Sequence, residues 1–330
     1  MSATTVQGES SAGQRPESDR VPRPRSGSRR RVRPGTGAAM YRPWWMPVLW
    51  VAPSVILTLV FGLFPFINTV VLSFTDARPL GGGGDWVGFQ NYIDLLTDEN
   101  FWLATRNSVI YAIVAVPLLV LLPLMLAQLV YRHVWGIGFF RTAFYTPVIA
   151  SVVAVALVWQ NLFSDRGPIN SFLKVFGLAE PIPFLSEPAL ILLSAILLTV
   201  WKGLGWYMIF YLAALAQIPP ELYEAAEIDG AGPVRRFFHI TVPNVRLTML
   251  LIAIMSGIGS LRVFTEVYIL GGPTGGPGGE ARTLPFYIRD TALDPIAGNA
   301  GYGAAVSVAL FVLTIGLAIA SQKLGGEDEE

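Results

Sequence analysis

Cysteine is absent from this chain of 330 residues, and histidine occurs only at His133 and His239. Without cysteine the chain can form no disulfide, no thiolate metal site and no lipid-modified N-terminal cysteine. Two histidines are also too few for a typical histidine-based zinc site. Charged residues make up only 14% of the chain, and the formal net charge is zero. We therefore expect neither a metal centre nor a bound cofactor in this chain.

Signatures of catalysis are missing as well. No GxxxxGK[ST] phosphate loop occurs anywhere, so we do not expect the chain to hydrolyse ATP. The run GGPTGGPGG at 271–279 is glycine-rich, but no Lys-Ser/Thr pair follows it, and we interpret it as a flexible loop. Glu224 and Glu227 form an acidic pair in a segment that we expect to be exposed, where a solvated face explains them better than acid-base catalysis does. The sequence predicts no enzyme.

What the chain has in abundance is hydrophobic residues, at 53% of the total with a mean hydropathy of +0.53. A helix needs about 20 apolar residues to cross the roughly 30 Å hydrocarbon core of a bilayer. Six runs reach that length, so we predict an all-α integral membrane protein with six transmembrane helices. The expected spans are residues 46–74, 104–131, 142–163, 188–214, 247–270 and 301–322.

The ends of the chain differ from its middle. Residues 1–43 hold nine arginines and three acidic residues among Ser, Gly and Pro, and such a composition cannot build a core. We expect a disordered cytoplasmic tail whose positive charge sets the topology and attracts anionic lipid. Nucleic-acid binding is the alternative, but no aromatic residue occurs before Tyr41, and we predict no nucleic-acid partner. Residues 324–330 form an acidic cytoplasmic end after the membrane domain, 44–323.

Basic residues in the short loops predict the orientation, because they remain on the cytoplasmic side. The tail, the loop 132–141 and the loop 215–246 carry most of them, whereas the alternate loops are poor in basic residues. We expect a multi-pass protein of the bacterial cell (inner) membrane with both termini in the cytoplasm.

The segment 215–246, between the fourth and fifth spans, is charged and punctuated by Gly and Pro. Pro219 and Pro220 favour the start of a helix, and Gly230 is in a place typical of a helix C-terminus. Pro233 can begin a second short helix, which we expect Pro243 to stop. One predicted face of the first helix carries Leu222, Ala225, Ala226 and Asp229, and one stripe of the second carries Val234, Phe237, Phe238 and Thr241. This helix-turn-helix either lies on the membrane surface or docks against a partner.

The spacing EAA-x3-G-x9-I-x-V-P in this segment resembles the EAA loop of permease subunits in binding-protein-dependent ABC importers. A Val replaces the usual Leu before the proline. Stretches at 86–96, 139–163, 252–276 and 301–310 are similar to the carbohydrate branch, as in the first permease of maltose-type and glycerol-phosphate-type systems. The resemblance implies a coupling helix that docks on an ATPase through Glu224, Ala225, Ala226, Asp229, Gly230, Ile240 and Pro243.

The resemblance also implies partners: a second permease that completes a heterodimeric pore, a cytoplasmic ATPase dimer that holds ATP and Mg, and an extracytoplasmic solute-binding protein. Its implied cargo is a sugar, an oligosaccharide or glycerol phosphate. An ion-coupled secondary carrier for a small polar solute is the alternative, but it predicts two repeated halves, which the sequence does not display. A passive membrane scaffold would leave the EAA spacing unexplained.

Polar residues inside the expected spans are candidates for a substrate pathway, because ionisable groups at membrane depth usually face a cavity or a partner. Lys202 lies in the middle of the fourth span, and Arg262 and Glu266 are four residues apart in the fifth, where they could form an ion pair. Aromatic and amide side chains are further candidates, although helix packing explains each of them as well: Asn107, Tyr111, Trp201, Tyr207, Phe264 and Tyr268.

Overall fold

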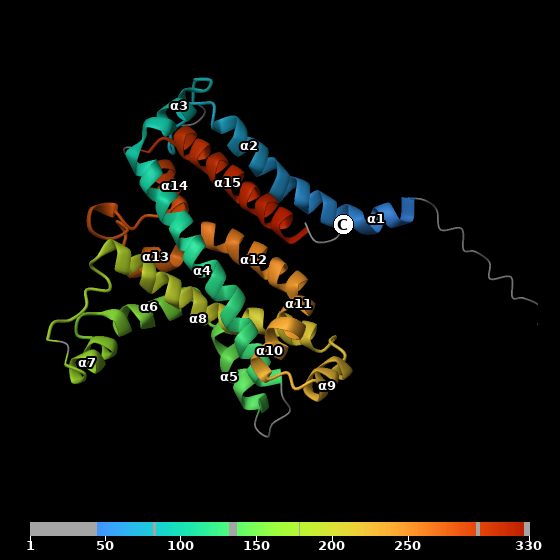
Figure 1. The fold of residues 1–330 in the computed structure, drawn as a ribbon. Helices are drawn as coiled ribbons and strands as arrows, with labels where there is room; N and C mark the ends of the chain where they lie inside the picture. The colour runs from blue at the N-terminus through green and yellow to red at the C-terminus, as the bar shows by residue number, and fades with distance from the viewer. Residues whose placement is uncertain (1–44, 82–83, 132–136, 178, 295–297, 327–330) are drawn as a thin grey trace, which may run out of the picture. The chain divides into compact units, whose positions relative to one another are not determined.

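The computed structural model describes residues 45–81, 84–131, 137–177, 179–294 and 298–326 (Figure 1). Our predictions for the tail 1–43 and for residues 327–330 lie outside this part of the chain. Within it all regular structure is helical, apart from one isolated antiparallel bridge between Thr75 and Trp86. The predicted all-α class is confirmed.

The chain divides into two compact units, residues 1–56 and 57–330. In the first unit the described residues belong to helix α1 (Trp45–Thr58), in which no side chain is buried. A helix that is apolar on all sides is suited to a lipid environment. The second unit contains all the other elements, and the packing described below concerns this unit.

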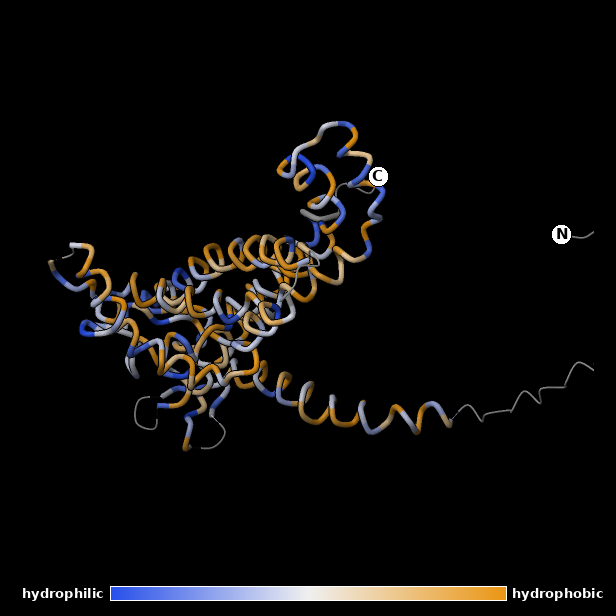
Figure 2. Tube along the Cα trace, turned by 90° about the horizontal axis from the view of Figure 1, so that it is seen from below, coloured by the Kyte–Doolittle hydropathy of each residue, from blue (hydrophilic) through white to orange (hydrophobic). Residues whose placement is uncertain are grey.

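Four helices are long and apolar enough to cross a bilayer, and they coincide closely with four of the expected spans. They are Trp45–Leu72 (α1, η1 at Leu59–Leu63 and α2 at Phe64–Leu72), α4 (Glu99–Tyr131), α8 (Pro188–Leu215) and α15 (Ala300–Gly326). Figure 2 shows hydrophobic residues along these helices and polar residues concentrated in the connecting segments. Such extensive exposed apolar surface is typical of a protein surrounded by lipid rather than water.

The other two expected spans are broken, so the prediction of one continuous helix for each is wrong. Residues 142–163 form α5 (Ile137–Ile149) and α6 (Val152–Phe163), with a bend of 100° at the break between them. Pro147 lies in the last turn of α5, where its ring and missing N–H weaken the helix. Residues 247–270 form α12 (Arg246–Leu261) and α13 (Thr265–Leu270). The described residues contain four spans, or six if two bent pairs each count as one span. These pairs are Gly138–Ile149 with Val152–Val175 and Pro233–Asn244 with Arg246–Leu261, so the break between α12 and α13 is not one of them.

Packing in the second unit centres on α4 and α8, which lie against each other. Helix α12 packs against α4, and α15 packs against both α12 and α2, as Figure 1 shows. The two halves of the broken third span have different neighbours, because α5 packs against α8 and α6 packs against α13. Gly205 permits the first of these contacts, since a Cβ there would collide with the Phe144 carbonyl.

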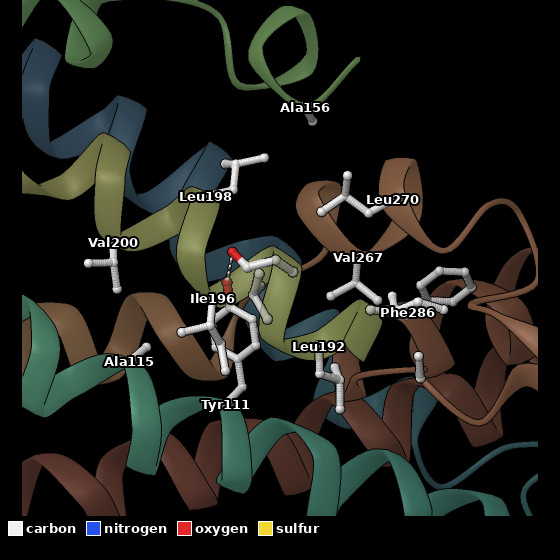
Figure 3. Close-up of a cluster of buried hydrophobic side chains, with 14 of the residues drawn as sticks. Tyr111, Ala115, Ala156, Leu192, Ile196, Leu198, Val200, Val267, Leu270 and Phe286 are labelled. Atoms are coloured by element: carbon white, nitrogen blue, oxygen red, sulfur yellow. Dashed lines mark hydrogen bonds between the residues drawn. The ribbon is translucent and has the colours of Figure 1, made fainter. Parts of the chain in front are cut away.

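A buried hydrophobic cluster fills the space between α4, α8 and α13 (Figure 3). Tyr111 stands at its centre, fully buried, and its hydroxyl donates to the Ala195 carbonyl at 3.0 Å. The same oxygen lies 2.7 Å from Thr199 Oγ1. Because a buried hydroxyl is costly without partners, these bonds fix the register of α4 against α8.

Short helices connect the long ones: α3 (Gln90–Thr97), α7 (Pro168–Val175), α9 (Pro220–Ile228), α10 (Pro233–Arg236), the π-helix η2 (Phe237–Thr241), α11 (Val242–Asn244), the 3-10 turn η3 (Pro277–Gly279) and α14 (Leu284–Leu293). Asn91 of α3 donates 2.8 Å hydrogen bonds to the carbonyls of Ser73 and Thr75. A second cluster joins Leu95 and Phe101 to Leu284 and Val306, so α3, α4, α14 and α15 meet in one place.

Candidate functional site

A cavity of about 310 Å³ lies where α4, α5, α8, α12 and α13 converge. It brings together three of the predicted pathway residues, Lys202, Tyr207 and Glu266. Its remaining lining is Leu119, Val148, Thr199, Gly203, Trp206, Ser256, Gly259 and Ser260. A pocket with apolar and aromatic walls and a few polar groups is typical of small-molecule sites.

Lys202 is the one basic residue among the described residues that line this cavity. Its Nζ lies 3.0 Å from the Pro147 carbonyl, 3.1 Å from that of Val148 and 2.8 Å from that of Ala150. An ammonium group has three N–H donors, so these carbonyls can use all of them. Lys202 therefore contributes its aliphatic stem to the cavity wall while its charge is turned toward the end of α5.

Glu266, at the start of α13, faces Lys202 within electrostatic range and lies close to Thr199. Two serines of α12 lie on the cavity wall. Ser256 donates to the Ile252 carbonyl at 2.6 Å, whereas the buried Ser260 hydroxyl makes no hydrogen bond with any described residue. The polar groups of the cavity are thus one carboxylate and several hydroxyls, a set suited to hydrogen-bonding a polar solute.

The predicted pairing of Arg262 with Glu266 is wrong. Helix α12 ends at Leu261 and α13 begins at Thr265, so the two residues do not share a helical face. Arg262 is exposed outside the cavity, and no ion pair joins it to Glu266 in the described structure.

Asn107 and Tyr111 also lie outside the cavity. Asn107 Nδ2 donates to the carbonyls of Glu280 at 2.7 Å and Arg282 at 2.8 Å, which uses both of its N–H groups. Tyr111 is in the buried cluster described above. Asn107 therefore holds α4 to the chain that follows the glycine-rich loop, and Tyr111 holds α4 to α8.

The remaining aromatic candidates form ring contacts at the cavity's margins. Trp201 packs against Trp159 with ring centroids 5.7 Å apart. Phe264 stacks on Tyr268 at 5.2 Å, and the Arg289 guanidinium lies 5.1 Å from the centre of the Tyr268 ring. These contacts fit helix packing, the alternative explanation stated for each of them above.

Sequence reasoning missed Thr199, Trp206, Ser256 and Ser260 as cavity residues. A helical projection from Lys202 could have found the first two, because positions three before and four after it lie on the same face. The serines are four residues apart in α12, a spacing that places both hydroxyls on one side. No group of three His, Cys, Asp or Glu residues within the described ranges could hold a metal ion.

The segment between α8 and α12 is a second candidate site. Helix α9 begins at Pro220 after the cap residue Pro219, as predicted, and Gly230 follows it with a φ of +74°. The Gly230 N–H donates to the Glu227 carbonyl at 3.0 Å and the Ala231 N–H to that of Ala226 at 2.8 Å. This pair of bonds is the Schellman motif, in which a left-handed glycine ends the helix.

Beyond the glycine, the second helix begins at Pro233 as predicted and ends at Asn244, one residue after Pro243. The chain passes from α10 through η2 into α11, with Pro243 in the first turn of α11, and the helix bends by 70° before α12. The wider turn of the π-helix just before Pro243 lets the chain remain helical there. Ile240 packs into the cluster around Tyr211, which anchors the segment to α8. The Tyr223 hydroxyl lies 2.9 Å from Thr241 Oγ1, so α9 and η2 are also joined to each other.

Several apolar side chains of this segment are nevertheless exposed. Ile228 is 87% exposed, Val234 69% and Phe238 61%, and Leu222 and Ala225 are exposed as well. The predicted stripe of the second helix divides, because Phe237 and Thr241 point inward while Val234 and Phe238 do not. A cavity of about 520 Å³ opens beside the segment and is lined by Tyr131, Tyr223, Arg236 and Phe237, among others. We call the exposed set Leu222, Ala225, Ile228, Val234 and Phe238 the docking surface.

The glycine-rich loop is folded onto its own chain, in contrast to the flexible loop that we expected. The Gly276 N–H donates to the Gly271 carbonyl at 2.7 Å and the Ala281 N–H to that of Gly275 at 2.9 Å. Five of its glycines have positive φ, which lets the chain turn this tightly: Gly272, Gly275, Gly276, Gly278 and Gly279. Asn107 holds the far end of the loop through the two bonds given above.

Asp98, which lies between α3 and α4, is hydrogen-bonded to side chains of α14 and α15. The hydroxyls of Tyr287, in α14, and Tyr302, in α15, both donate to its Oδ2, the latter at 2.6 Å. Burial raises the pKa of Asp98, but these hydrogen bonds outweigh that effect and hold the pKa below its ordinary value. Burial and the bond to Asp98 raise the pKa of Tyr287.

Comparisons with known proteins identify the family of the chain. The family model described as "Binding-protein-dependent transport system inner membrane component" matches residues 106–324. The chain is 37% identical over 242 residues to the lactose transport system permease protein LacF of Rhizobium radiobacter, which covers 73% of this chain and 80% of that protein. It is 30% identical to the trehalose/maltose transport system permease protein MalF of Thermococcus litoralis, covering 88% and 97%.

A solved structure has the same fold. It is the bacterial alginate ABC transporter in complex with an alginate pentasaccharide-bound periplasmic protein, with a TM-score of 0.74 and 25% sequence identity. The match covers 86% of this chain and 94% of that one.

Proposed function

This chain belongs to the family of inner membrane components of binding-protein-dependent transport systems, and we propose that, as a permease subunit of an ABC importer, it takes up a sugar or an oligosaccharide. The observation that carries the proposal is the extent of the family match, because residues 106–324 include both the central cavity and the segment between α8 and α12. The transport systems to which LacF and MalF belong, for lactose and for trehalose and maltose, support a saccharide as cargo. The match favours this function over the ion-coupled carrier.

The central cavity is the proposed passage for the solute. Its hydroxyls, its carboxylate and the rings of Trp206 and Tyr207 suit the alternating polar and apolar surface of a sugar. Lys202 offers no free N–H donor to a phosphate, because three carbonyls use its donors. An uncharged saccharide therefore fits this passage better than glycerol phosphate does.

The segment between α8 and α12 is the proposed contact with a cytoplasmic ATPase dimer, which holds ATP and Mg. Glu224, Ala225, Ala226, Asp229 and Gly230 would form the coupling helix and its turn. The exposed side chains of the docking surface support this role, because an apolar surface at the end of a short amphipathic helix is unfavourable in water. Ile240 would support the helix from within, and Pro243 would set its exit.

The remaining partners in this proposal are a second permease, which completes a heterodimeric pore, and an extracytoplasmic binding protein that delivers the solute. The complex of the alginate transporter with its periplasmic protein supports the second partner. ATP binding would draw the coupling helices together and favour the outward-open state over the inward-open state.

The orientation follows from the same proposal, with both termini in the cytoplasm. A reporter protein fused at residue 232 is expected to be cytoplasmic, and one fused at residue 275 to be extracytoplasmic. The reverse result would contradict the placement of the docking surface on the ATPase side.

The experiment that tests the function is reconstitution of the full chain in liposomes with the second permease, the ATPase and the binding protein of the same importer. We expect ATP hydrolysis to rise when the binding protein is loaded with a matching saccharide, and labelled saccharide to accumulate only with ATP. Accumulation by the chain alone on an ion gradient would instead support the secondary carrier.

A further inference from the structure

The broken third span leaves a helix end inside the membrane domain. Helix α5 stops at Ile149 and α6 starts at Val152, with a bend of 100° at this break. The last carbonyls of a helix have no partner within it. In lipid no water can satisfy them, and each unpaired group costs several kcal/mol. The end of α5 therefore requires hydrogen-bond donors from another part of the protein.

Lys202 supplies these donors from the middle of α8. Its ammonium lies within 3.1 Å of the carbonyls of Pro147, Val148 and Ala150. Charge-assisted hydrogen bonds of this kind are about twice as strong as neutral ones. The positive charge also faces the negative end of the α5 dipole, which adds to the attraction.

The break separates two helices that have different main neighbours, although α8 also packs against α13 in the buried cluster. Helix α5 is held to α8 by Lys202 and by the close contact at Gly205. Helix α6 is held to α13, where Gln160 Nε2 donates to the Ile269 carbonyl at 2.8 Å. Residues 150 and 151 join the two helices, and Ser151 has an extended ψ of 131°. Glu266 of α13 faces Lys202.

We propose that Lys202 is a positioning residue that fastens the end of α5 to α8 across the break at residues 150–151, so that α5 follows α8 when α8 moves. Motion that enters at the docking surface reaches α5 through α8, which directly precedes that surface in the chain. Lys202 acts on transport through α5 and makes no hydrogen bond to the solute. The kinetic part of this inference rests on the proposed importer function, whereas the structural part does not.

The structural part is tested by distances between spin labels, for which the absence of native cysteine is an advantage. One label pair is placed at the exposed Ile149→Cys, at the end of α5, and Ile209→Cys, on α8. A control pair is placed at Ile113→Cys on α4 and Leu197→Cys on α8. The distribution of distances between the two labels of each pair is measured in the full chain, purified with its partners. It is measured with Lys202 intact, with Lys202→Met and with Lys202→Arg.

We expect Lys202→Met to broaden the 149–209 distance distribution, Lys202→Arg to keep it narrow, and the 113–197 distribution to stay unchanged in both. An unchanged 149–209 distribution in Lys202→Met would overturn the proposal. If Lys202→Met does not accumulate in the membrane, Lys202→Gln, which retains two N–H donors, replaces it. A 149–209 distribution in Lys202→Gln identical to that of the unsubstituted chain would then overturn it.

The kinetic part is tested with the reconstituted importer. We expect Lys202→Met to lower the maximal transport rate about tenfold or more. The concentration of saccharide-loaded binding protein that gives the half-maximal rate should not change. Lys202→Arg should restore most of the rate, and Lys174→Met, on α7, should have no effect. A rise in the half-maximal concentration at an unchanged maximal rate would instead make Lys202 a solute ligand. If the intact chain transports nothing, the proposed function fails, and the label distances still decide the structural part.

Discussion

Two connecting segments of this protein, both rich in glycine and proline, are built in opposite ways. The segment between α8 and α12 exposes large apolar side chains, with Ile228 the most exposed of them. The loop between α13 and α14 turns its backbone inward, where its carbonyls receive hydrogen bonds from its own amides and from Asn107. The first segment leaves apolar surface exposed, whereas the polar backbone groups of the second are paired within the loop and with α4.

The difference between the two segments predicts which of them contributes more free energy to partner binding. Exposed Ile, Val and Phe side chains release water on binding and can contribute much of an interface's free energy. A loop whose polar groups are already paired can present a fixed shape but has fewer free donors to offer. We therefore expect substitutions in the docking surface to change binding of the ATPase, and substitutions around the loop to change stability first.

The largest effect is expected for Ile228→Asp. Loss of a buried apolar side chain at an interface costs about 2–3 kcal/mol, and a desolvated carboxylate adds to that, so affinity for the ATPase should fall about 100-fold or more. The thermal stability of the chain itself should not change, because Ile228 is 87% exposed. Co-purification of the ATPase with the detergent-solubilised chain measures the effect.

Val175→Asp is the matched control for this prediction, since Val175 ends α7 and is 83% exposed. It should leave ATPase recovery unchanged. Equal recovery of the ATPase with both variants would contradict the assignment of the docking surface.

A smaller loss of ATPase binding is expected for Gly230→Ala. A non-glycine residue at a φ of +74° costs about 1–2 kcal/mol, so the turn after α9 should shift and ATPase affinity should fall about tenfold. Gly177→Ala is the control, because Gly177 also has a positive φ and open space around it but ends α7. If the two alanine variants weaken ATPase binding alike, general strain explains the loss and the turn has no specific role.

Substitution of a residue that holds the glycine-rich loop should lower the thermal stability of the chain. Asn107→Ala removes two hydrogen bonds and leaves the carbonyls of Glu280 and Arg282 without them, at a cost of about 1–3 kcal/mol. We expect Tm to fall by about 3–8 °C, with ATPase recovery maintained. Asn161→Ala removes only an exposed bond within α6 and should leave Tm within about 1 °C. A larger fall in the control than in Asn107→Ala would show that the loop is not held by Asn107.

The smallest effect concerns pH. The folded-state pKa of Asp98 is lowered, so its stabilising contribution is present above the ordinary value of about 3.9 and is lost as the pH falls through the lowered pKa. At pH 7 the Tm of the intact protein should be higher than that of the Asp98→Asn variant. This difference in Tm should disappear in strongly acidic buffer. Glu99→Gln, at the exposed neighbouring residue, should show no such dependence. A Tm difference that persists unchanged to the acid end would contradict the role of the tyrosine bonds.

Local rules predicted the start and end of α9, because Pro219, Pro220 and Gly230 act through their own backbone geometry. The four continuous spans were likewise visible as long apolar runs. The break at residues 150–151 was not, since prolines are tolerated in membrane helices and the decisive contacts come from Lys202, more than 50 residues away in sequence. The misassigned pair of Arg262 and Glu266 has the same origin, because a spacing of four has meaning only on an unbroken helix.

The most direct test of the account is a cross-link from the docking surface. A single Ile228→Cys, carrying a photoreactive benzophenone in the otherwise cysteine-free chain, is irradiated in membranes that contain the assembled transporter. Thr274→Cys, exposed in the glycine-rich loop, carries the same group as the control. We predict a product of this chain joined to the ATPase from residue 228 and none from residue 274. Transport-competent membranes without an ATPase product from residue 228 would contradict the account.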